Sequence, residues 1–309
     1  MQLPLPKLEW LQRREIHRQR AAQWTLPHRE RRLRHEPHPI NDFLFDYYSF
    51  RPSLLERWSP GWSLPLEGAT LADFPASEGW IETDHALKLS LGSFPRHRLD
   101  SFRWMIELLK ITLERPPQFT CYGLHEWAMV YKINQTRYPS VPLRMTPSAL
   151  SAFIESQTIC CTHHDAFRFY TPEAKPLNRH QPSKANRLDL EQSGCIHVTM
   201  DLYKWAHKFY PWTPSDLILE AFELAIESRQ IDMKASPYDL SQWGLTPIKI
   251  ETVEGKSEYI EEQRKIHLRG IPIRQKLLDF YQTMNQALSV GSGNNFNTEG
   301  GGVERGLYS

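Results

Sequence analysis

Apolar residues recur at spacings of three and four along most of this chain, which is the period of an amphipathic α-helix. The pattern is clear in residues 98–115 and in the segments that follow residues 147, 214 and 237. Alternation with period two, which marks half-buried strands, occurs only briefly, as in PIKIETV at residues 247–253. The chain is therefore predicted to be mainly α-helical, a single compact helical domain with few or no short strands.

Several helix starts share one chemistry, a capping hydroxyl followed by proline at the first helical position. His38 before Pro39 is a candidate for a further start. The hydroxyl–proline pairs are Thr146-Pro147, Thr213-Pro214 and Ser236-Pro237.

The chain divides into three parts by composition. Residues 1–35 form a basic N-terminal arm or helix, because residues 7–34 hold nine Lys or Arg against three Glu. This segment either contacts DNA or another acidic partner, or packs as a solvated helix on the body through Leu8, Trp10 and Leu11. Residues 36–283 form the helical catalytic domain, and the Gly- and Asn-rich residues 284–309 are expected to be a disordered tail.

The net charge and the cysteine positions indicate which partners and which cellular compartment to expect. The 309 residues carry a net charge of +1, so any attraction to nucleic acid must be local. Four cysteines at positions 121, 160, 161 and 195 show no CxxC spacing, which suits a reducing compartment. No apolar run reaches the roughly 18 residues of a membrane span, and the first residues, MQLPLPKLEW, lack the charged start and apolar core of a signal peptide. We expect a cytoplasmic protein without a membrane partner; the sequence does not indicate its oligomeric state.

Residues 197–210 read as a mainly buried helix with a narrow polar stripe. At 100° per residue, His197, Asp201, Lys204 and Lys208 fall within about 60° of one another. Because an unpaired buried charge is costly, this stripe must face either a polar pocket or a thin exposed edge with internal ion pairs.

Two His-x-x-x-Asp spacings could present ligands to a metal. His38 with Asp42, and His197 with Asp201, stand four residues apart and so share a helix face. With His163 or Asp165 added, they would form a nitrogen and oxygen site for iron, manganese or zinc. The alternatives are chance spacing among 13 histidines and, for His38, an N-cap.

Other stretches combine ionisable and aromatic side chains. In residues 123–132, His125 or Glu126 either lines a pocket as a proton carrier or lies in a core helix. Asp232 follows an apolar helix and is a candidate carboxylate, whereas Asp239 can serve as a cap near Ser236. In residues 160–172, CCTHHDAFRFYTP, an extended chain would point His163 and Asp165 the same way, and Arg168 could bind an anion or neutralise Asp165.

Five strings give the sequence a family resemblance. HPINDFLFDYYSFRPSLLERWSPG, YGLHEWAMVY, THHDAFRFYTPEAKPLN, CIHVTMDLYKWAHK and IDMKASPYDL, which cover roughly residues 36–265, resemble bacterial proteins labelled 3-methyladenine DNA glycosylase. The resemblance implies release of an alkylated purine from DNA, with a carboxylate acting at the sugar and the basic segment on the backbone. The Gly-rich hairpin of helix-hairpin-helix glycosylases is not found, so no residue is carried over from that fold.

Three functions follow as hypotheses: a DNA-repair N-glycosylase, which requires no cofactor; a metal-dependent enzyme acting on a small aromatic or nucleobase-like substrate; and a helical binding protein without activity. The candidate catalytic residues are Asp201, Asp165, Asp232, His125 and Glu126. The candidate substrate-binding residues are Arg168, Lys204, Trp205, Tyr238, Asp239 and Trp127. The possible metal ligands are His38, Asp42, His163 and His197.

Overall fold

The fold is mainly α-helical, as the apolar spacing predicts. The computed structural model describes residues 3–74, 79–83, 85–133, 136 and 138–293. Within these residues the α-helices are α1 (Lys7–Arg34), α2 (Phe43–Tyr48), α3 (Pro52–Leu55), α4 (Leu99–Glu114), α5 (Leu124–Ala128), α6 (Pro147–Glu155), α7 (His164–Phe167), α8 (Arg187–Leu190), α9 (Ile196–His207), α10 (Ser215–Lys234) and α11 (Val253–Gly293).

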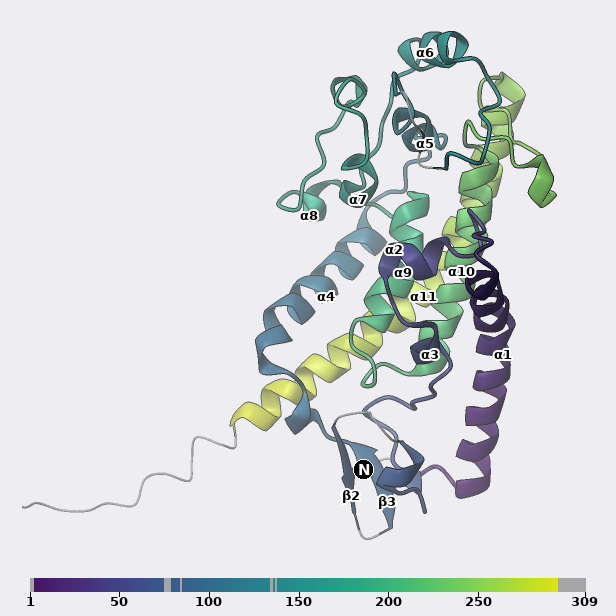
Figure 1. Cartoon of the computed structure of the whole chain (residues 1–309). Helices are drawn as coiled ribbons and strands as arrows, with labels where there is room; N and C mark the ends of the chain where they lie inside the picture. Colours follow the sequence, from purple (N-terminus) through teal and green to yellow (C-terminus); the bar gives the residue numbers. More distant parts are fainter. Residues whose placement is uncertain (1–2, 75–78, 84, 134–135, 137, 294–309) are drawn as a thin grey trace, which may run out of the picture.

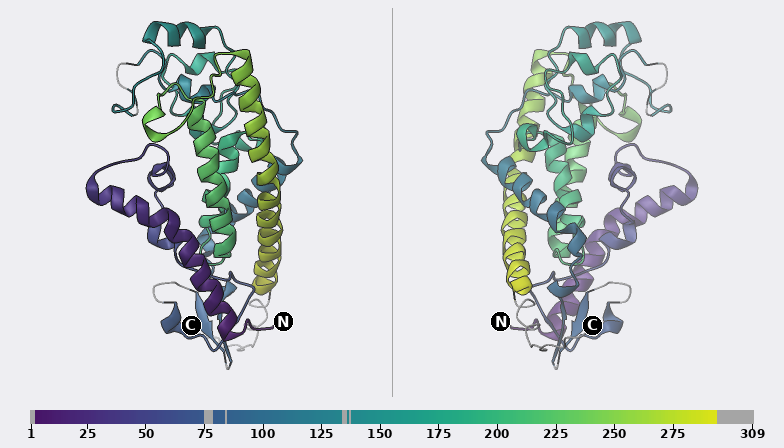
Figure 2. Two further views of the ribbon diagram at one scale, coloured as in Figure 1. Left: turned by 90° about the vertical axis from the view of Figure 1, so that its right-hand side faces the viewer. Right: turned by 90° about the vertical axis from the view of Figure 1, so that its left-hand side faces the viewer.

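The centre of the molecule is a set of long helices. Helices α9 and α10 pack along one another, and α11 covers both and also contacts α4 (Figure 1). Gly270 permits the close approach of α11, because a Cβ at this position would lie 3.1 Å from Thr199 Cγ2 on α9. Figure 2 shows α10 and α11 running side by side, with α1 inclined to them.

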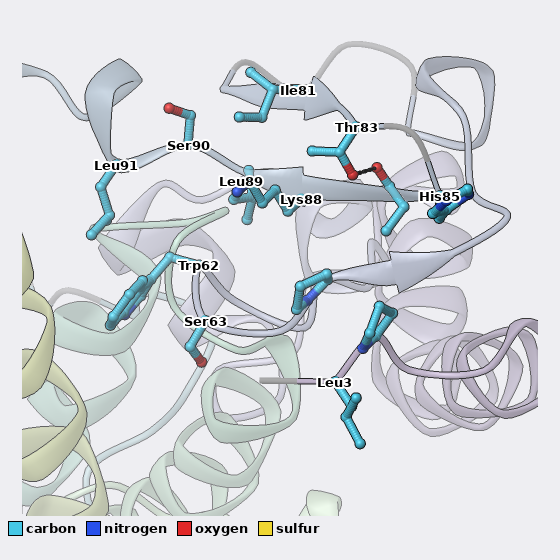
Figure 3. A pocket seen from close by; sticks show the side chains of 13 residues that line it. Leu3, Trp62, Ser63, Ile81, Thr83, His85, Lys88, Leu89, Ser90 and Leu91 are labelled. Atoms are coloured by element: carbon cyan, nitrogen blue, oxygen red, sulfur yellow. Dashed lines mark hydrogen bonds between the residues drawn. The ribbon is translucent and has the colours of Figure 1, made fainter. Parts of the chain in front are cut away.

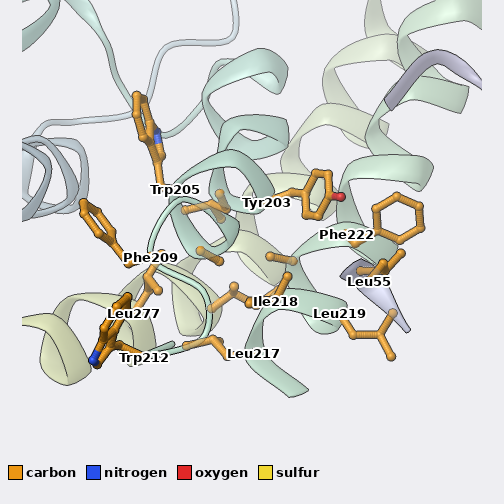
Figure 4. Packing of buried hydrophobic residues seen from close by; sticks show 14 of the residues in the cluster. Leu55, Tyr203, Trp205, Phe209, Trp212, Leu217, Ile218, Leu219, Phe222 and Leu277 are labelled. Carbon is orange, nitrogen blue, oxygen red and sulfur yellow. The ribbon is translucent and has the colours of Figure 1, made fainter. Parts of the chain in front are cut away.

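A large apolar cluster fills the space between these helices. Side chains from α9, α10 and α11 interdigitate in it, together with Leu55 of α3 (Figure 4). A second cluster lies at the other end of α10 and includes Leu124, Trp127 and Tyr259. The short helices α5, α6 and α7 surround this second cluster, so that α5 and α7 face the N-terminal half of α9 and the C-terminal half of α10 (Figure 1).

A small antiparallel sheet lies at the opposite end of the molecule from α5 and α7 (Figure 1). Its strands are β1 (Leu66–Glu67), β2 (Trp80–Glu82) and β3 (Ala86–Leu89), in the order β1-β3-β2. A hollow of about 730 Å³ opens beside the sheet, between Leu3, Trp62 and Ile81 (Figure 3). The alternating residues 247–253 form no strand, because this segment turns into the start of α11.

The basic segment is a packed helix. Helix α1 buries Trp10, His17 and Ala21 against the body, whereas Leu8, a predicted contact, is 84% exposed. Seven of its eight arginines pair with carboxylates, both within the helix and on the body, which removes much of its positive field. The pairs are Arg13–Glu9, Arg14–Asp73, Arg18–Glu15, Arg20–Glu223, Arg29–Glu56, Arg31–Asp42 and Arg32–Asp46.

Two predicted boundaries differ from the structure. Helix α11 continues to Gly293, so the first ten residues of the predicted tail 284–309 are helical; Tyr281 and Met284 bury its inner face in the core. Residues 294–309 lie outside the described residues. Ser236-Pro237 begins no helix, since Tyr238 instead forms an isolated bridge with Leu143. Thr146 does cap α6, where its hydroxyl accepts from the Ala149 amide.

Among the described helices, none combines the length and the apolar character needed to cross a membrane. The long helices α1 and α11 carry charged residues throughout their sequences.

Candidate functional site

Two adjoining groups of buried histidines and carboxylates lie where α5, α7, α9 and α10 meet. The Asp232 group consists of His125 on α5, His197 on α9 and Asp232 on α10. The Asp201 group consists of His163 and Asp165 around the start of α7 and Asp201 on α9. In each group one ligand atom from every residue lies within 4.8 Å of the other two.

The local backbone brings His125 into this position. Helix α5 starts directly after Gly123, whose φ of +72° lies in the left-handed region that favours glycine. A Cβ at Gly123 would also lie 3.1 Å from Ala235 Cβ, just beyond the end of α10. The tight turn therefore sets α5 against α10 and directs His125 to Asp232.

In the Asp232 group, two imidazoles face one carboxylate. His125 Nε2 lies 2.7 Å from Asp232 Oδ1, and its Nδ1 lies 3.5 Å from the Cys121 sulfur. His197 Nε2 lies 3.9 Å from Asp232 Oδ2, which is too far for a hydrogen bond. In the part of the chain that the structure describes, His197 Nδ1 also has no hydrogen-bond partner. His197 is thus a buried imidazole held mainly by packing against the His125 ring, 4.4 Å away.

A buried arginine stands behind this group. Arg229 Nη1 donates to Glu126 at 2.6 Å and to Asp232 Oδ2 at 2.8 Å. Its Nη2 donates to the Tyr138 hydroxyl at 3.1 Å, and its guanidinium lies 3.8 Å from the centre of the Phe43 ring. Glu126, a predicted proton carrier, therefore serves as a counter-charge of Arg229.

The two histidines of the Asp232 group differ in charge. Burial lowers the pKa of His125, but the Asp232 carboxylate outweighs it and raises this pKa to about 9. Burial and the neighbouring cationic His125 hold the pKa of His197 well below its ordinary value. His197 is therefore neutral near pH 7, the form in which an imidazole binds a metal.

The Asp201 group already contains cations of its own. The Lys204 ammonium lies 2.8 Å from Asp165 Oδ2 and 3.3 Å from Asp201 Oδ2. Arg187 reaches Asp165 Oδ2 at 2.6 Å, and the Tyr48 hydroxyl donates to Asp201 Oδ1 at 2.7 Å. An ammonium thus takes the position between the two carboxylates where a metal would lie.

His163 is fixed by hydrogen bonds at both ring nitrogens. The Ala166 amide donates to its Nδ1 at 3.2 Å, because His163 is the N-cap of α7. The proton of a neutral ring is therefore on Nε2, which donates to Asp201 Oδ2 at 3.2 Å. The His163 ring stacks on His197 at 5.4 Å and so connects the two groups.

The pKa values of the two aspartates follow from these cations. Burial would raise the pKa of Asp201, but Lys204 and His163 outweigh it and hold this pKa well below its usual range. Burial would likewise raise the pKa of Asp165, and Lys204 and Arg187 hold it far below its usual range. Both carboxylates are charged throughout the neutral range.

Glu191 is a carboxylate that sequence reasoning missed. It is 1% exposed, and neither of its carboxylate oxygens has a hydrogen-bond partner among the described residues. Its nearest cations are Arg187 Nε at 3.6 Å and His163 Nε2 at 3.8 Å. Burial raises the pKa of Glu191. The i,i+4 spacing of Arg187 and Glu191 was the only signal for it in the sequence.

Several predicted residues lie outside both groups. Asp42 is held by His28 at 2.8 Å and Arg31 at 3.0 Å on α1, and its predicted metal partner His38 instead caps the turn at Ile40 and Asn41. The His197 and Asp201 pair does reach the site but is divided, since each residue joins a different group.

The predicted substrate-binding residues are also dispersed. Arg168 is exposed and lies over Phe169 at 4.6 Å, so that Arg187 rather than Arg168 neutralises Asp165. Trp127 and Tyr238 are buried in the second apolar cluster. Asp239 accepts from the Ser241 amide at 3.0 Å, a local turn contact. Trp205 is 4% exposed and packs beside Lys204, which is the one member of this set that contacts the site.

Comparison with known proteins adds no family. No protein-family model matches the sequence, and neither a curated protein nor a solved structure shows significant similarity to it. The function must therefore be argued from the site.

Proposed function

We propose that the protein is a metal-dependent enzyme whose metal is bound by His125, His197 and Asp232. Two imidazoles and one carboxylate are the donor set of many catalytic zinc and non-haem iron sites, which leave further positions open. The convergence of one ligand atom from each residue within 4.8 Å supports this assignment. The proton shared by His125 and Asp232 would be replaced by the metal, since both atoms that hold it are metal ligands.

The observation that carries this proposal is the state of His197. A buried polar group left without a hydrogen bond costs about 1–3 kcal/mol. His197 is 6% exposed and neutral, its Nδ1 has no partner among the described residues, and its Nε2 stands 3.9 Å from a carboxylate oxygen. A metal between His197, His125 and Asp232 would bind the Nε2 lone pair of His197, which no hydrogen bond occupies among the described residues, and the ring proton would stay on Nδ1.

The neighbouring groups suit proton handling. A metal bound at such a site polarises a bound oxygen or activates water, so hydrolysis of a small substrate is the reaction class we propose. His163 lies beside His197 and has its proton on Nε2, directed at Asp201. Glu191, 3.8 Å from that nitrogen and without a hydrogen bond among the described residues, is placed to accept a proton.

Release of alkylated purine from DNA is the second candidate, and the five strings that resemble the glycosylase-labelled family favour it. This reaction needs a carboxylate close to the sugar of the extruded nucleotide. Asp165, Asp201 and Asp232 are at most 9% exposed, and each is ion-paired. The same three residues would have to become accessible when DNA binds.

Metal analysis tests the proposal directly. Untagged protein purified without chelator, or reconstituted with Zn²⁺, Mn²⁺ or Fe²⁺, should hold about one metal per chain by elemental analysis. His197→Ala and Asp232→Asn should lose it. His38→Ala is the matched control, because His38 is an imidazole outside both groups, and it should keep the metal. Failure of the wild type to bind any of the three metals would contradict the proposal.

A base-release assay separates the two candidates. Methylated DNA is incubated with wild-type protein and with His197→Ala, each with and without EDTA, and free base is measured. We expect no release in any of the four reactions. Release that persists in EDTA and in His197→Ala would establish the glycosylase and overturn a metal-dependent reaction.

A further inference from the structure

The polar stripe of α9 continues beyond the buried site to the surface. His197 and Asp201 are buried, the Lys204 side chain is 24% exposed, and Lys208 follows at the C-cap of the helix with intermediate exposure. At 1.5 Å per residue, Lys208 lies roughly 16 Å along the helix from His197. The surface end of the stripe is therefore separate from the Asp232 group.

Two cations meet at this end without an acidic partner. Lys204 is neutralised by Asp165 and Asp201, whereas Lys208 and Arg98 form no ion pair within the described residues. Arg98 donates from Nη2 to the Lys208 carbonyl at 2.5 Å, and its guanidinium lies 4.8 Å from the centre of the Phe209 ring. The contact fixes the Arg98 guanidinium beside the Lys208 backbone at the end of α9 and leaves its remaining donors available.

The electrostatics of the cluster agree with this geometry. Burial lowers the pKa of Lys208, and the cations Arg98, Lys204 and Arg187 lower it further, with no carboxylate opposing them. Burial also lowers the pKa of Arg98. Like charges that are partly desolvated repel one another, so an anion bound between them would be stabilised.

Aromatic rings border the same place. The Trp205 ring has the Lys204 ammonium 4.4 Å and the Lys208 ammonium 5.7 Å from its centre. Trp104 of α4 packs edge-on against it at 5.8 Å and is partly exposed. Figure 4 shows Trp205, Phe209 and Trp212 following one another at the end of α9. Trp205, Phe209 and Trp212 are buried, so Trp104 is the ring of this set with exposed area for a ring system attached to the anion.

We infer that Arg98 and Lys208 form a binding site for the phosphate group of a small molecule. An arginine fork next to a lysine point charge is a common means of binding phosphate oxygens. A small ligand is favoured over a DNA backbone because Arg98 and Lys208 lie beside aromatic rings, while seven of the eight arginines of α1, the most basic helix, are paired with carboxylates. The inference goes beyond the proposed function and does not require the metal.

Equilibrium titration tests the site with inorganic phosphate and adenosine monophosphate as probes, in EDTA so that no metal takes part. Lys208→Ala should weaken binding of both probes about tenfold, since it removes one charged hydrogen bond to the phosphate. Lys208→Glu should abolish it. Arg98→Lys keeps the charge but loses the fork, and should weaken binding several-fold. Lys110→Ala removes an exposed lysine of α4 and is the matched control, with no change expected.

Thermal unfolding of each variant shows whether it is folded, and Lys208→Glu, which places an anion at the C-terminal end of α9, is expected to unfold a few degrees below the wild type. The inference is overturned if wild-type protein binds neither probe, or if Lys208→Glu binds them as the wild type does. Binding of a 12-base-pair duplex without binding of the two small probes would also overturn it, in favour of a DNA surface. Metal content measured on the same samples reports separately on the proposed function.

Discussion

The Asp232 group and the Asp201 group contain the same kinds of residue at similar burial, yet they differ in their cations. In the Asp201 group, the Lys204 ammonium lies between Asp165 and Asp201, and Arg187 adds a second charge. In the Asp232 group, Arg229 approaches Asp232 from one side only, and His197 on the other side has no hydrogen-bond partner within the described residues.

The difference shows that histidines and carboxylates in proximity do not by themselves define a metal site. Both groups meet the same geometric condition. What distinguishes them is the cation between the ligands: in the Asp201 group it is the Lys204 ammonium, which a metal must displace at a cost in Coulomb energy, whereas in the Asp232 group it is the proton on His125, which a metal can replace on the same atoms. By this criterion we propose that the Asp232 group binds the metal and that the Asp201 group positions His163.

The largest expected effect comes from removing the cation that supports each group. Arg229→Met should lower the free energy of unfolding by about 3–5 kcal/mol, because it leaves Glu126 and Asp232 buried without their arginine. Lys204→Met should lower it by less, about 1–3 kcal/mol, since the Lys204 ammonium is partly exposed and Asp201 keeps His163 and Tyr48 as hydrogen-bond partners. Urea unfolding monitored by circular dichroism measures both. Equal losses would show that the two groups are equally closed to water.

Metal affinity distinguishes the groups more directly. His197→Ala should weaken Zn²⁺ binding at least about 100-fold, because it removes one of three ligands. His163→Ala should weaken it less than about tenfold, as an outer residue that only stacks on His197. Competition with a chromophoric chelator measures both constants. If His163→Ala lost the metal and His197→Ala retained it, the metal would belong to the Asp201 group and not to the Asp232 group.

Much of the fold could be predicted from the sequence, whereas the site could be predicted only in part. The helical spacing of apolar residues correctly predicted α4 and the buried α9, and Thr146-Pro147 correctly predicted the start of α6. The same stripe on α9 indicated that His197 and Asp201 face a polar interior. The sequence also joined His163 or Asp165 to these two residues, but it did not show that Asp232 faces His197, because Asp232 arrives from a distant segment through tertiary packing.

The wrong prediction of a metal site at His38 and Asp42 and the failure to predict Glu191 have the same cause, which is contact with distant parts of the chain. His38 and Asp42 have the spacing of His197 and Asp201, but Arg31 and His28 of α1 neutralise Asp42. Local spacing shows which side chains share a helix face and contains nothing about the charges brought by another helix. Glu191 was missed for this reason, since its significance depends on the position of His163.

Acid titration should reveal the ion pairs of Asp165. The folded-state pKa of Asp165 lies below its unfolded value, so its contribution to stability is complete above pH 4 and is lost as the pH falls through the folded pKa. Below about pH 3.8, the free energy of unfolding of the wild type should fall by about 1.4 kcal/mol per pH unit more than that of Asp165→Asn. This slope corresponds to the uptake of one proton on unfolding. Urea unfolding at pH 5, 4 and 3 measures the two slopes. Parallel slopes would mean that Lys204 and Arg187 do not stabilise the Asp165 carboxylate.

The smallest expected effect tests how firmly the Asp201 group is held. The Tyr48 hydroxyl donates to Asp201 Oδ1 at 2.7 Å, while His163 and Lys204 both approach Oδ2. Tyr48→Phe should therefore lower the free energy of unfolding by about 1 kcal/mol, because one of several contacts to the carboxylate is lost. Tyr210→Phe is the matched control, since its hydroxyl makes no hydrogen bond within the described residues, and should change stability by less than about 0.5 kcal/mol. Zinc affinity should be unaltered in Tyr48→Phe if Asp201 positions His163 only. A loss of zinc in this variant would place Asp201 among the metal ligands and remove the distinction between the two groups.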